Sequence, residues 1–545
     1  MGSNRFKMKG TAETMGLLNR YRFFAAGVCA FLLSATAVHA SDSLTVMTDG
    51  GRVVGTLSGD GQVRSFLGIP YAAPPVGPLR WKPPQPAAKW SGVRSATSFG
   101  PRCMQTKLFP DMVFRDPGPS EDCLTLNVWV PAGKNAAPLP VMVWIHGGGF
   151  VTGGSSEPRQ DGEHLARKGV IVVSMNYRLG IFGFFALPSL RAESAKHAAG
   201  NYGLMDQASA LEWVHRNIAA FGGDPNKVTI FGESAGSISV NALMASPLSR
   251  GSFVGAIGES GGALTGPGLT FLSQRVSDQR GEKFARSAFK NSSLSFLRSV
   301  SAADLLKAAT AAPHSEETFW PNVDGDFLPE SVADIFAKGE QSHVPLLAGW
   351  NKDEGSQAVL DQSEKPTPES LRAMAEKRFG PRAQEFLNVY AASNDAEALR
   401  VAEDFAGDAF IAYSTWQWLE AQVKTGNSPV YRYRFDLGSP GDPFHPALLA
   451  FHSDDIEYVF GTLDSRHGAK WRPEDYKLSE LMQNCWTNFA KSGDPNGPGL
   501  PRWPTYNKAG NWPVMHLSPD SQARPDRHRD RYLFLQQVWG PDAAH

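Results

Sequence analysis

Short apolar runs rich in β-branched and aromatic residues recur along the chain and predict buried strands. They lie at 124–130, 140–145, 171–175, 228–231, 344–350 and 430–435. Helical patterns at 162–168 and 204–221 precede the third and the fourth of these runs. Because strands that alternate with helices form crossover units, we expect an α/β fold with a mostly parallel central sheet and helices on both faces.

Two regions outside this alternation predict additional elements. Alternating apolar and polar residues at 44–57 and 63–67, around a Gly-Asp-Gly turn, predict N-terminal antiparallel hairpins. Residues 366–424 are mainly helical in pattern and lie between two late strands, which predicts a helical insertion over the sheet, either a lid or a packing element. No repeat or low-complexity linker divides the chain, so we expect one domain over 41–545.

The first 40 residues have the pattern of a targeting segment. Basic residues as far as Arg22 precede an apolar run at 23–37 and the small residue Ala40. This order is typical of a secretory signal peptide cut after Ala40. The alternative, a retained membrane anchor, is disfavoured because the run is shorter than a membrane-spanning helix. We therefore expect a protein exported to the periplasm or secreted, without stable membrane insertion.

Composition and charge narrow the class of partner. Hydrophobic residues make up 42% of the chain and charged residues 20%, which is typical of a globular protein with a large core. Residues 1–40 hold five Lys/Arg and one Asp/Glu, so the remainder carries a formal net charge of −5 and no basic tract. We therefore expect no nucleic-acid partner, and we expect a monomer.

Three cysteines follow the signal segment. Cys103 and Cys123 flank a stretch without helical period, whereas Cys485 lies in a helical pattern. In an exported protein two of the three are expected to pair, so we predict a Cys103–Cys123 disulfide that closes a surface loop. The alternative is that both thiols are free.

The strongest candidate for chemistry is Ser234, in a Gly-x-Ser-x-Gly frame between a strand signal and a helical pattern. Glycines at 232 and 236 allow a tight strand-to-helix turn that projects the serine hydroxyl above the sheet. The frame alone is weak because Gly-rich turns are common. The flanking strand and helix favour a nucleophile elbow.

Acyl transfer by serine also needs donors for an oxyanion, a base and an orienting carboxylate. The run Gly147-Gly-Gly149 follows a strand, so we predict an oxyanion hole from the N–H groups of Gly148, Gly149 and Ala235. Asp353 and Glu354 follow the strand signal at 344–350, and either carboxylate is placed to face the site. For the base, spacing does not separate His445 from His452.

Longer motifs resemble the type-B carboxylesterase family, which includes bacterial p-nitrobenzyl esterases, animal carboxylesterases and cholinesterases. The elbow at 221–236 matches the family's serine signature, and 121–131 matches its second signature. Further matches cover nearly the whole mature chain. They include the stretches 66–71, 176–180, 200–207, 351–355 and 486–490.

The resemblance implies an α/β-hydrolase fold and a site. It assigns Glu354 as the acid, and His452 as the base because His452 begins the family's His-x-x-Asp-Ile-x-Tyr-Val-Phe run. It also supports the Cys103–Cys123 bond, with its loop at the mouth of a gorge. Glu233 and Ser260 are similar to the family's supporting polar groups around the triad.

The implied activity is hydrolysis of a small-to-medium organic ester through an acyl-enzyme, without a metal or organic cofactor. One alternative is a non-catalytic adhesion module, because some family members lack the triad. Another is an esterase for polycarboxylate, mycotoxin-like esters, which Lys107 and Arg115 would serve, although solvated surface charge explains both. Apolar residues at 108–114 and 319–320 are candidates for the gorge wall or for the core.

Overall fold

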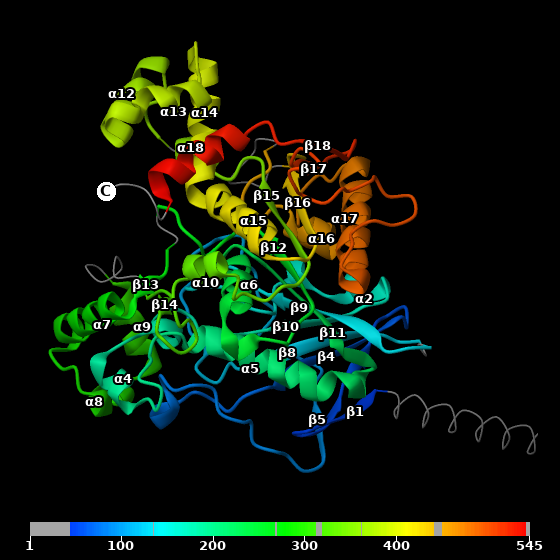
Figure 1. The fold of residues 1–545 in the computed structure, drawn as a ribbon. Coiled ribbons are helices and arrows are strands. Elements are labelled where there is room, and N and C mark those ends of the chain that lie inside the picture. The colour runs from blue at the N-terminus through cyan, green and yellow to red at the C-terminus, as the bar shows by residue number, and fades with distance from the viewer. Residues whose placement is uncertain are drawn as a thin grey trace, which may run out of the picture.

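The computed structural model describes residues 44–133, 136–267, 270–311, 319–360, 362–440 and 449–540. The predicted signal segment lies outside these residues. The described residues form an α/β-hydrolase fold built on one large mixed sheet (Figure 1). Within the described part of the chain, no helix is both long and apolar enough to cross a membrane.

The large sheet has β-strands in a spatial order that differs from the chain order. From one edge to the other they are β18 (Gln522–Pro525), β17 (Pro513–Leu517), β16 (Val430–Phe435), β15 (Leu346–Asn351), β12 (Gly255–Glu259), β11 (Gly223–Glu233), β9 (Leu139–Ile145), β10 (Ile171–Met175), β8 (Thr125–Pro131), β4 (Val63–Pro70) and β3 (Thr56–Leu57). The strands from β17 to β10 run parallel, while β18, β8 and β3 are antiparallel to their neighbours.

The two faces of the sheet pack against different helices, as alternation along a strand requires. On β9, Val143 and Ile145 join the core cluster that contains α5 (Tyr202–Asn217), α6 (Ala235–Ala245), α10 (Val332–Lys338) and α15 (Tyr413–Thr425). Met142 and Trp144 point to the other face and pack with α2 (Glu163–Arg167), α16 (Ile456–Phe460) and α17 (Pro473–Ser492). Both faces are therefore covered, as predicted.

Smaller elements surround this core. A separate sheet contains β1 (Thr45–Thr48), β2 (Gly51–Val54) and β5 (Val93–Ser95), and the short pairs are β6 (Arg102–Cys103) with β7 (Pro119–Ser120) and β13 (Leu272–Ser273) with β14 (Asn322–Val323). The remaining α-helices are α3 (Gly180–Phe184), α4 (Pro188–Glu193), α7 (Gln274–Phe289), α8 (Leu294–Ser299), α9 (Ala302–Thr310), α11 (Ser356–Leu360), α12 (Pro368–Phe379), α13 (Ala383–Val389), α14 (Asp395–Gly407) and α18 (Arg529–Trp539).

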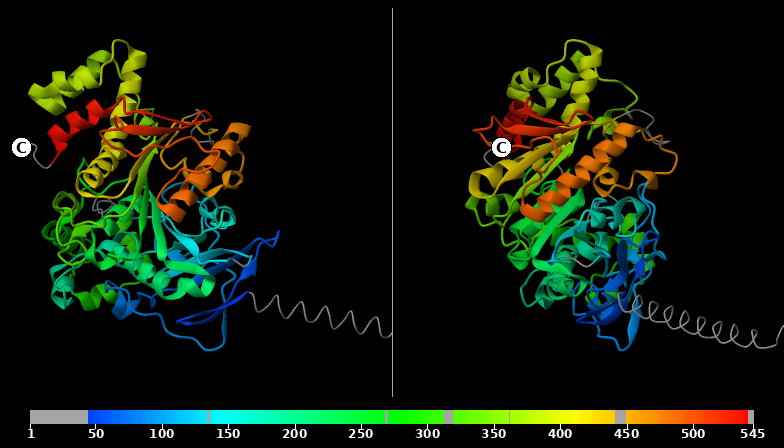
Figure 2. Two further views of the ribbon diagram at one scale, coloured as in Figure 1. Left: turned by 45° about the vertical axis from the view of Figure 1, so that its right-hand side comes forward. Right: turned by 90° about the vertical axis from the view of Figure 1, so that its right-hand side faces the viewer.

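The predicted helical insertion corresponds to α12, α13, α14 and α15, with the π-helical turn Asp408–Ala412 between the last two. Figures 1 and 2 show α12–α14 at the end of the molecule opposite β1 and β5. Only the C-terminal part of the insertion, through Ala406, Phe410 and Ile411, lines a large cavity that also contains Ser234. The first two helices of the insertion pack mainly on each other and on α14 and α18.

Three strands of the large sheet have no counterpart in the sequence prediction: β12, β17 and β18. The sequence of β12 is Gly-Ala-Ile-Gly-Glu, which carries few β-branched or aromatic residues. Its glycines are required by close packing, since a Cβ on Gly258 would lie 2.3 Å from Cζ3 of Trp418. The steric contact that makes β12 possible therefore also removes its sequence signal.

Candidate active site

Ser234 occupies the turn between β11 and α6 with φ of 55° and ψ of −121°, a strained conformation for a residue with a Cβ. Its N–H donates to the carbonyl of Glu259 at 2.8 Å, and its carbonyl accepts from the N–H of Ile238 at 2.9 Å. A Cβ on Gly236 would lie 2.0 Å from the carbonyl oxygen of Ile145. The glycine is therefore needed so that the elbow can approach the end of β9.

The glycine run after β9 lies beside the elbow. Gly148 and Gly149 have φ of 98° and 62°, and both line the same cavity as Ser234 and Ala235. A Cβ on Gly148 would lie 2.2 Å from the carbonyl oxygen of Thr152, so only glycine fits this turn. Ala235 is the first residue of α6, where backbone N–H groups lack partners within the helix. The three predicted oxyanion donors are thus in one place.

The predicted base and acid are in direct contact. Nδ1 of His452 lies 2.6 Å from Oε2 of Glu354, the shorter of the two carboxylate contacts of this ring. The other carboxylate oxygen, Oε1, accepts from Oγ of Ser260 at 2.6 Å and from the N–H of Asn351 at 2.8 Å. Both oxygens of Glu354 are therefore engaged, which fixes the carboxylate against the imidazole.

Asp353, next to Glu354, bonds to the backbone of Ala450 instead of the imidazole. Oδ2 of Asp353 accepts from the N–H of Ala450 at 2.9 Å, and the N–H of Asp353 donates to the carbonyl of Ala450 at 3.0 Å. These bonds tie the end of β15 to the loop that carries His452. Sequence spacing left Asp353 and Glu354 open; the structure brings Glu354 to the imidazole, while His445 lies outside the described residues.

Glu233 faces the other nitrogen of the ring. Its Oε1 lies 3.3 Å from Nε2 of His452 and forms no hydrogen bond in the described structure. Burial, opposed by His452, raises the pKa of Glu233 to about 8. Burial also opposes protonation of His452, but the charges of Glu354 and Glu233 outweigh it and raise the pKa of His452 to about 9. The imidazole therefore holds its proton tightly between two carboxyl groups.

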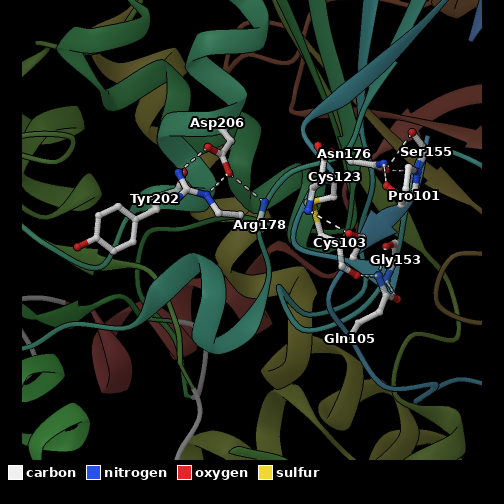
Figure 3. Close-up of a disulfide and its surroundings, with 12 residues drawn as sticks. Pro101, Cys103, Gln105, Cys123, Gly153, Ser155, Asn176, Arg178, Tyr202 and Asp206 are labelled. Atoms are coloured by element: carbon white, nitrogen blue, oxygen red, sulfur yellow. Dashed lines mark hydrogen bonds and ion pairs between the residues drawn. A yellow bond between two sulfur atoms is a disulfide. The ribbon is translucent and has the colours of Figure 1, made fainter. Parts of the chain in front are cut away.

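A cavity of about 1270 Å³ opens above these groups, and its wall is mainly apolar. Part of that wall is the segment 109–113, inside the loop that the Cys103–Cys123 disulfide closes. Figure 3 shows Gln105 reaching from this loop to Gly153, where it donates to the carbonyl at 2.7 Å and accepts from the N–H at 2.9 Å. The disulfide loop is thus held against the turn that contains the oxyanion glycines.

Not every predicted wall residue reaches the cavity. Trp320 lines it, whereas Phe319 packs in the core against Phe185 and Phe284. Neither Lys107 nor Arg115 is among the lining residues, and Arg115 forms an ion pair of 2.7 Å with Asp161. The residues that suggested an acidic substrate are therefore outside the cavity.

Sequence reasoning missed several residues of the wall. Phe410 lies in the π-helical turn after α14. Its ring contacts that of His452, with the ring centroids 5.0 Å apart. Two arginines also line the cavity and are already paired: Arg159 with Glu157 at 2.9 Å, and Arg466 with Glu457 at 3.0 Å. These residues come from distant segments without local motifs, so the sequence carries no signal that would have singled them out.

Comparison with known proteins agrees with this geometry. A sequence model of the carboxylesterase family matches residues 42–534 of this chain. The chain belongs to the carboxylesterase family. Its relatives include the fumonisin B1 esterase of Sphingopyxis macrogoltabida, 38% identical over 88% of each chain. The para-nitrobenzyl esterase of Bacillus subtilis is also 38% identical, over 85% of this chain and 92% of the relative.

Solved structures agree at the level of the fold. A PNB esterase superposes with a TM-score of 0.78 at 36% sequence identity, over 90% of this chain and 99% of that one. A thermophilic PNB esterase gives a TM-score of 0.77, again at 36% identity. The resemblance to type-B carboxylesterases predicted from the motifs is confirmed, and the protein is a carboxylic ester hydrolase.

Proposed function

We propose that this carboxylesterase hydrolyses small-to-medium organic esters without net charge through an acyl-enzyme on Ser234. The observation that carries the proposal is one constellation. His452 is held by Glu354 at 2.6 Å, and both line a single cavity with Ser234 and the oxyanion glycines. Nothing in this arrangement calls for a metal or an organic cofactor.

In the proposed mechanism His452 takes the proton of Ser234 as its hydroxyl attacks the ester carbonyl. Glu354 holds the imidazole in one tautomer and stabilises its positive form. The N–H groups of Gly148, Gly149 and Ala235 bind the oxyanion, and one such donor typically contributes about 2.7–4 kcal/mol to transition-state stabilisation. His452 then protonates the leaving alcohol, and water repeats the sequence to release the acid.

The charged side chains that line the cavity support an uncharged substrate. Among the described residues that line it, six carry carboxyl groups and only two are arginines, both of them already paired. Burial raises the pKa of Glu157 to about 7, with Arg159 opposing the shift. A polycarboxylate ester would find no unpaired guanidinium among the described lining residues, which disfavours the acidic-ester alternative despite the relative that is named for fumonisin B1.

The site of action that we propose is outside the cytoplasm, with the protein working as a monomer. The N-terminal charge and apolar pattern supports export. The Cys103–Cys123 disulfide is a second, independent support, because disulfides persist in oxidising compartments.

The test is a panel of initial rates on esters that vary in acyl length, alcohol bulk and charge. Ser234→Ala is expected to lose at least about 10⁴-fold in kcat on every active ester, because the nucleophile is gone. Ser237→Ala is the matched control, since this buried serine lies on the same helix but bonds the carbonyl of Gly261. Its turnover should remain.

Three outcomes would contradict the proposal. Equal turnover by wild type and Ser234→Ala would exclude the acyl-enzyme. A zero rate across the whole panel would favour the non-catalytic binding module. A strong preference for esters with several carboxylates would restore the polycarboxylate alternative.

A further inference from the structure

A second cavity, of about 200 Å³, lies next to Glu354, the proposed triad acid. Glu354 lines both this cavity and the catalytic one, so the two cavities share this residue. The second cavity is bounded by the ends of β15, β16 and β17, by α14, and by the start of α18. Figure 1 shows α18 beside these strands.

The second cavity has an excess of positive charge. Among the described lining residues, six carry cationic side chains and four carry carboxyl groups. The cationic residues are Lys352, Arg432, Arg434, Arg524, Arg527 and Arg531. One of the carboxyl groups, Asp408, is buried, and burial raises its pKa to about 6. At neutral pH this carboxyl group is still mostly ionised, so the positive excess rests on the number of cationic side chains.

Three of the arginines already have partners. Arg432 pairs with Asp526, and Arg531 pairs with Asp404 at 2.7 Å. Arg434 forms an ion pair of 2.5 Å with Asp436, which does not line the cavity. Even so, Nε of Arg432 is buried without a hydrogen bond in the described structure, and this residue is only 2% exposed. A buried donor without a partner is costly, so an acceptor that reached this donor would be bound favourably.

Two of the lining arginines have no counter-charge among the residues that the structure describes. Arg524 on β18 and Arg527 just before α18 are exposed and line the cavity, and neither forms an ion pair or side-chain hydrogen bond with any residue that the structure describes. The positive field of the cavity also acts on His528. Its burial, together with the charges of Arg531 and Arg434, lowers the pKa of His528 to about 4.

We propose that this second cavity binds a small oxyanion that carries at least two negative charges, such as phosphate or a short polycarboxylate. The guanidinium groups present planar pairs of N–H donors that match phosphate and carboxylate oxygens. The exposed Arg524 and Arg527 supply charge, and Arg432, a lining residue that is 2% exposed, has a donor without a partner in the described structure. The volume suits an ion of this size rather than an ester substrate.

Such an anion would act on the triad. Asn351 lines the second cavity, and its N–H donates to Oε1 of Glu354 at 2.8 Å. A dianion bound there places negative charge near Glu354, and so near the Glu354–His452 pair. Protonated His452 is then stabilised further, so the limb of kcat/KM that reports loss of its proton moves to higher pH.

The binding test is a thermal-unfolding titration of the full protein with sodium phosphate and, separately, sodium citrate. Sodium chloride at equal ionic strength is the reference. We expect a saturable rise in Tm for wild type. We expect loss of that rise in Arg524→Gln/Arg527→Gln, whose exposed substitutions leave the core intact. Arg275→Gln/Arg286→Gln, with both positions exposed on α7, is the control of equal charge change and should keep the rise.

Each result of the Tm titration either supports or overturns the proposed anion site. A rise with both anions, or with only one of them, supports the site and shows whether inorganic or organic oxyanions fit. No rise beyond the chloride reference overturns the proposal, as does an equal rise in the cavity variant and the α7 variant. The kinetic effect is checked by pH profiles with and without the binding anion. These profiles rest on the proposed mechanism, whereas the Tm titration does not.

Discussion

His452, the proposed base, lies between two carboxyl groups of different character. Glu354 has both oxygens engaged and contacts Nδ1, while Glu233 contacts Nε2 from a buried position with one oxygen free of hydrogen bonds. A base must be neutral to accept the serine proton, yet both neighbours favour its charged form. The pH dependence of the enzyme is therefore expected to reflect this balance.

The Glu233→Gln variant tests that balance. Removing a negative neighbour lowers the pKa of His452 from about 9, so the acid limb of kcat/KM should move to lower pH. The measurement is a pH profile from about 5 to 10 on a neutral ester. Glu212→Gln on the exposed face of α5 is the control and should leave the limb in place. An unchanged limb in Glu233→Gln would show that Glu233 does not act on the base.

At the level of single residues, a position could be predicted from the sequence where the motif is local. Ser234 and the glycines of 147–149 lie in contiguous motifs next to strands, so both could be placed from the sequence alone. The choice of Glu354 over Asp353 depends on which side chain turns toward a loop almost a hundred residues away. Spacing contains no such information, and only the family resemblance named the residue.

At the scale of elements, tight packing of small residues matters as much as hydrophobic pattern. Strand β12 carries the backbone that holds the elbow, because the carbonyl of Glu259 accepts from the N–H of Ser234. Its glycines leave room for Trp418 of α15 on one face of the sheet. Strands with long apolar runs were predictable, whereas β12 was not, since its signal depends on a partner helix far along the chain.

Gly258→Ala is expected to destabilise the protein. The added methyl group would meet the ring of Trp418 at 2.3 Å in a fully buried layer, and such overpacking costs about 1–3 kcal/mol in the free energy of unfolding. Gly59→Ala is the matched control: this exposed glycine has open space around the added atom, so a change below about 1 kcal/mol is expected. Urea unfolding measures both. Equal stability of the two variants would contradict the packing argument.

At the scale of the whole molecule, buried ionisable groups should make stability depend on pH. Glu157 and Glu233 have pKa values raised to about 7 and about 8, and that of His452 is raised to about 9. Each binds its proton more tightly in the folded state than in the unfolded state. Unfolding therefore releases protons, and stability falls as pH rises through these values.

We expect the free energy of unfolding to decrease between pH 7 and pH 9. Urea unfolding at several pH values in this window checks the slope. In Glu233→Gln the slope should be smaller, because one titrating group is gone and the pKa of His452 is lower. Below pH 6.5 the trend is opposed by His146 and His528, since burial lowers the pKa of each to about 4. A flat or rising profile above pH 7 would contradict the prediction.

The Cys103–Cys123 disulfide holds part of the cavity wall, so the redox conditions under which the protein is produced matter. The proposed triad and oxyanion glycines lie at the ends of strands of the central sheet or in the loops beside it, whereas the wall segment 109–113 lies in the loop that the Cys103–Cys123 disulfide closes. A batch produced in a reducing host would therefore contain enzyme with working chemistry and a loosened entrance. Its scope across bulky and slender esters would differ from that of oxidised enzyme, so selectivity recorded for this esterase is meaningful only when the thiol count of the sample is known.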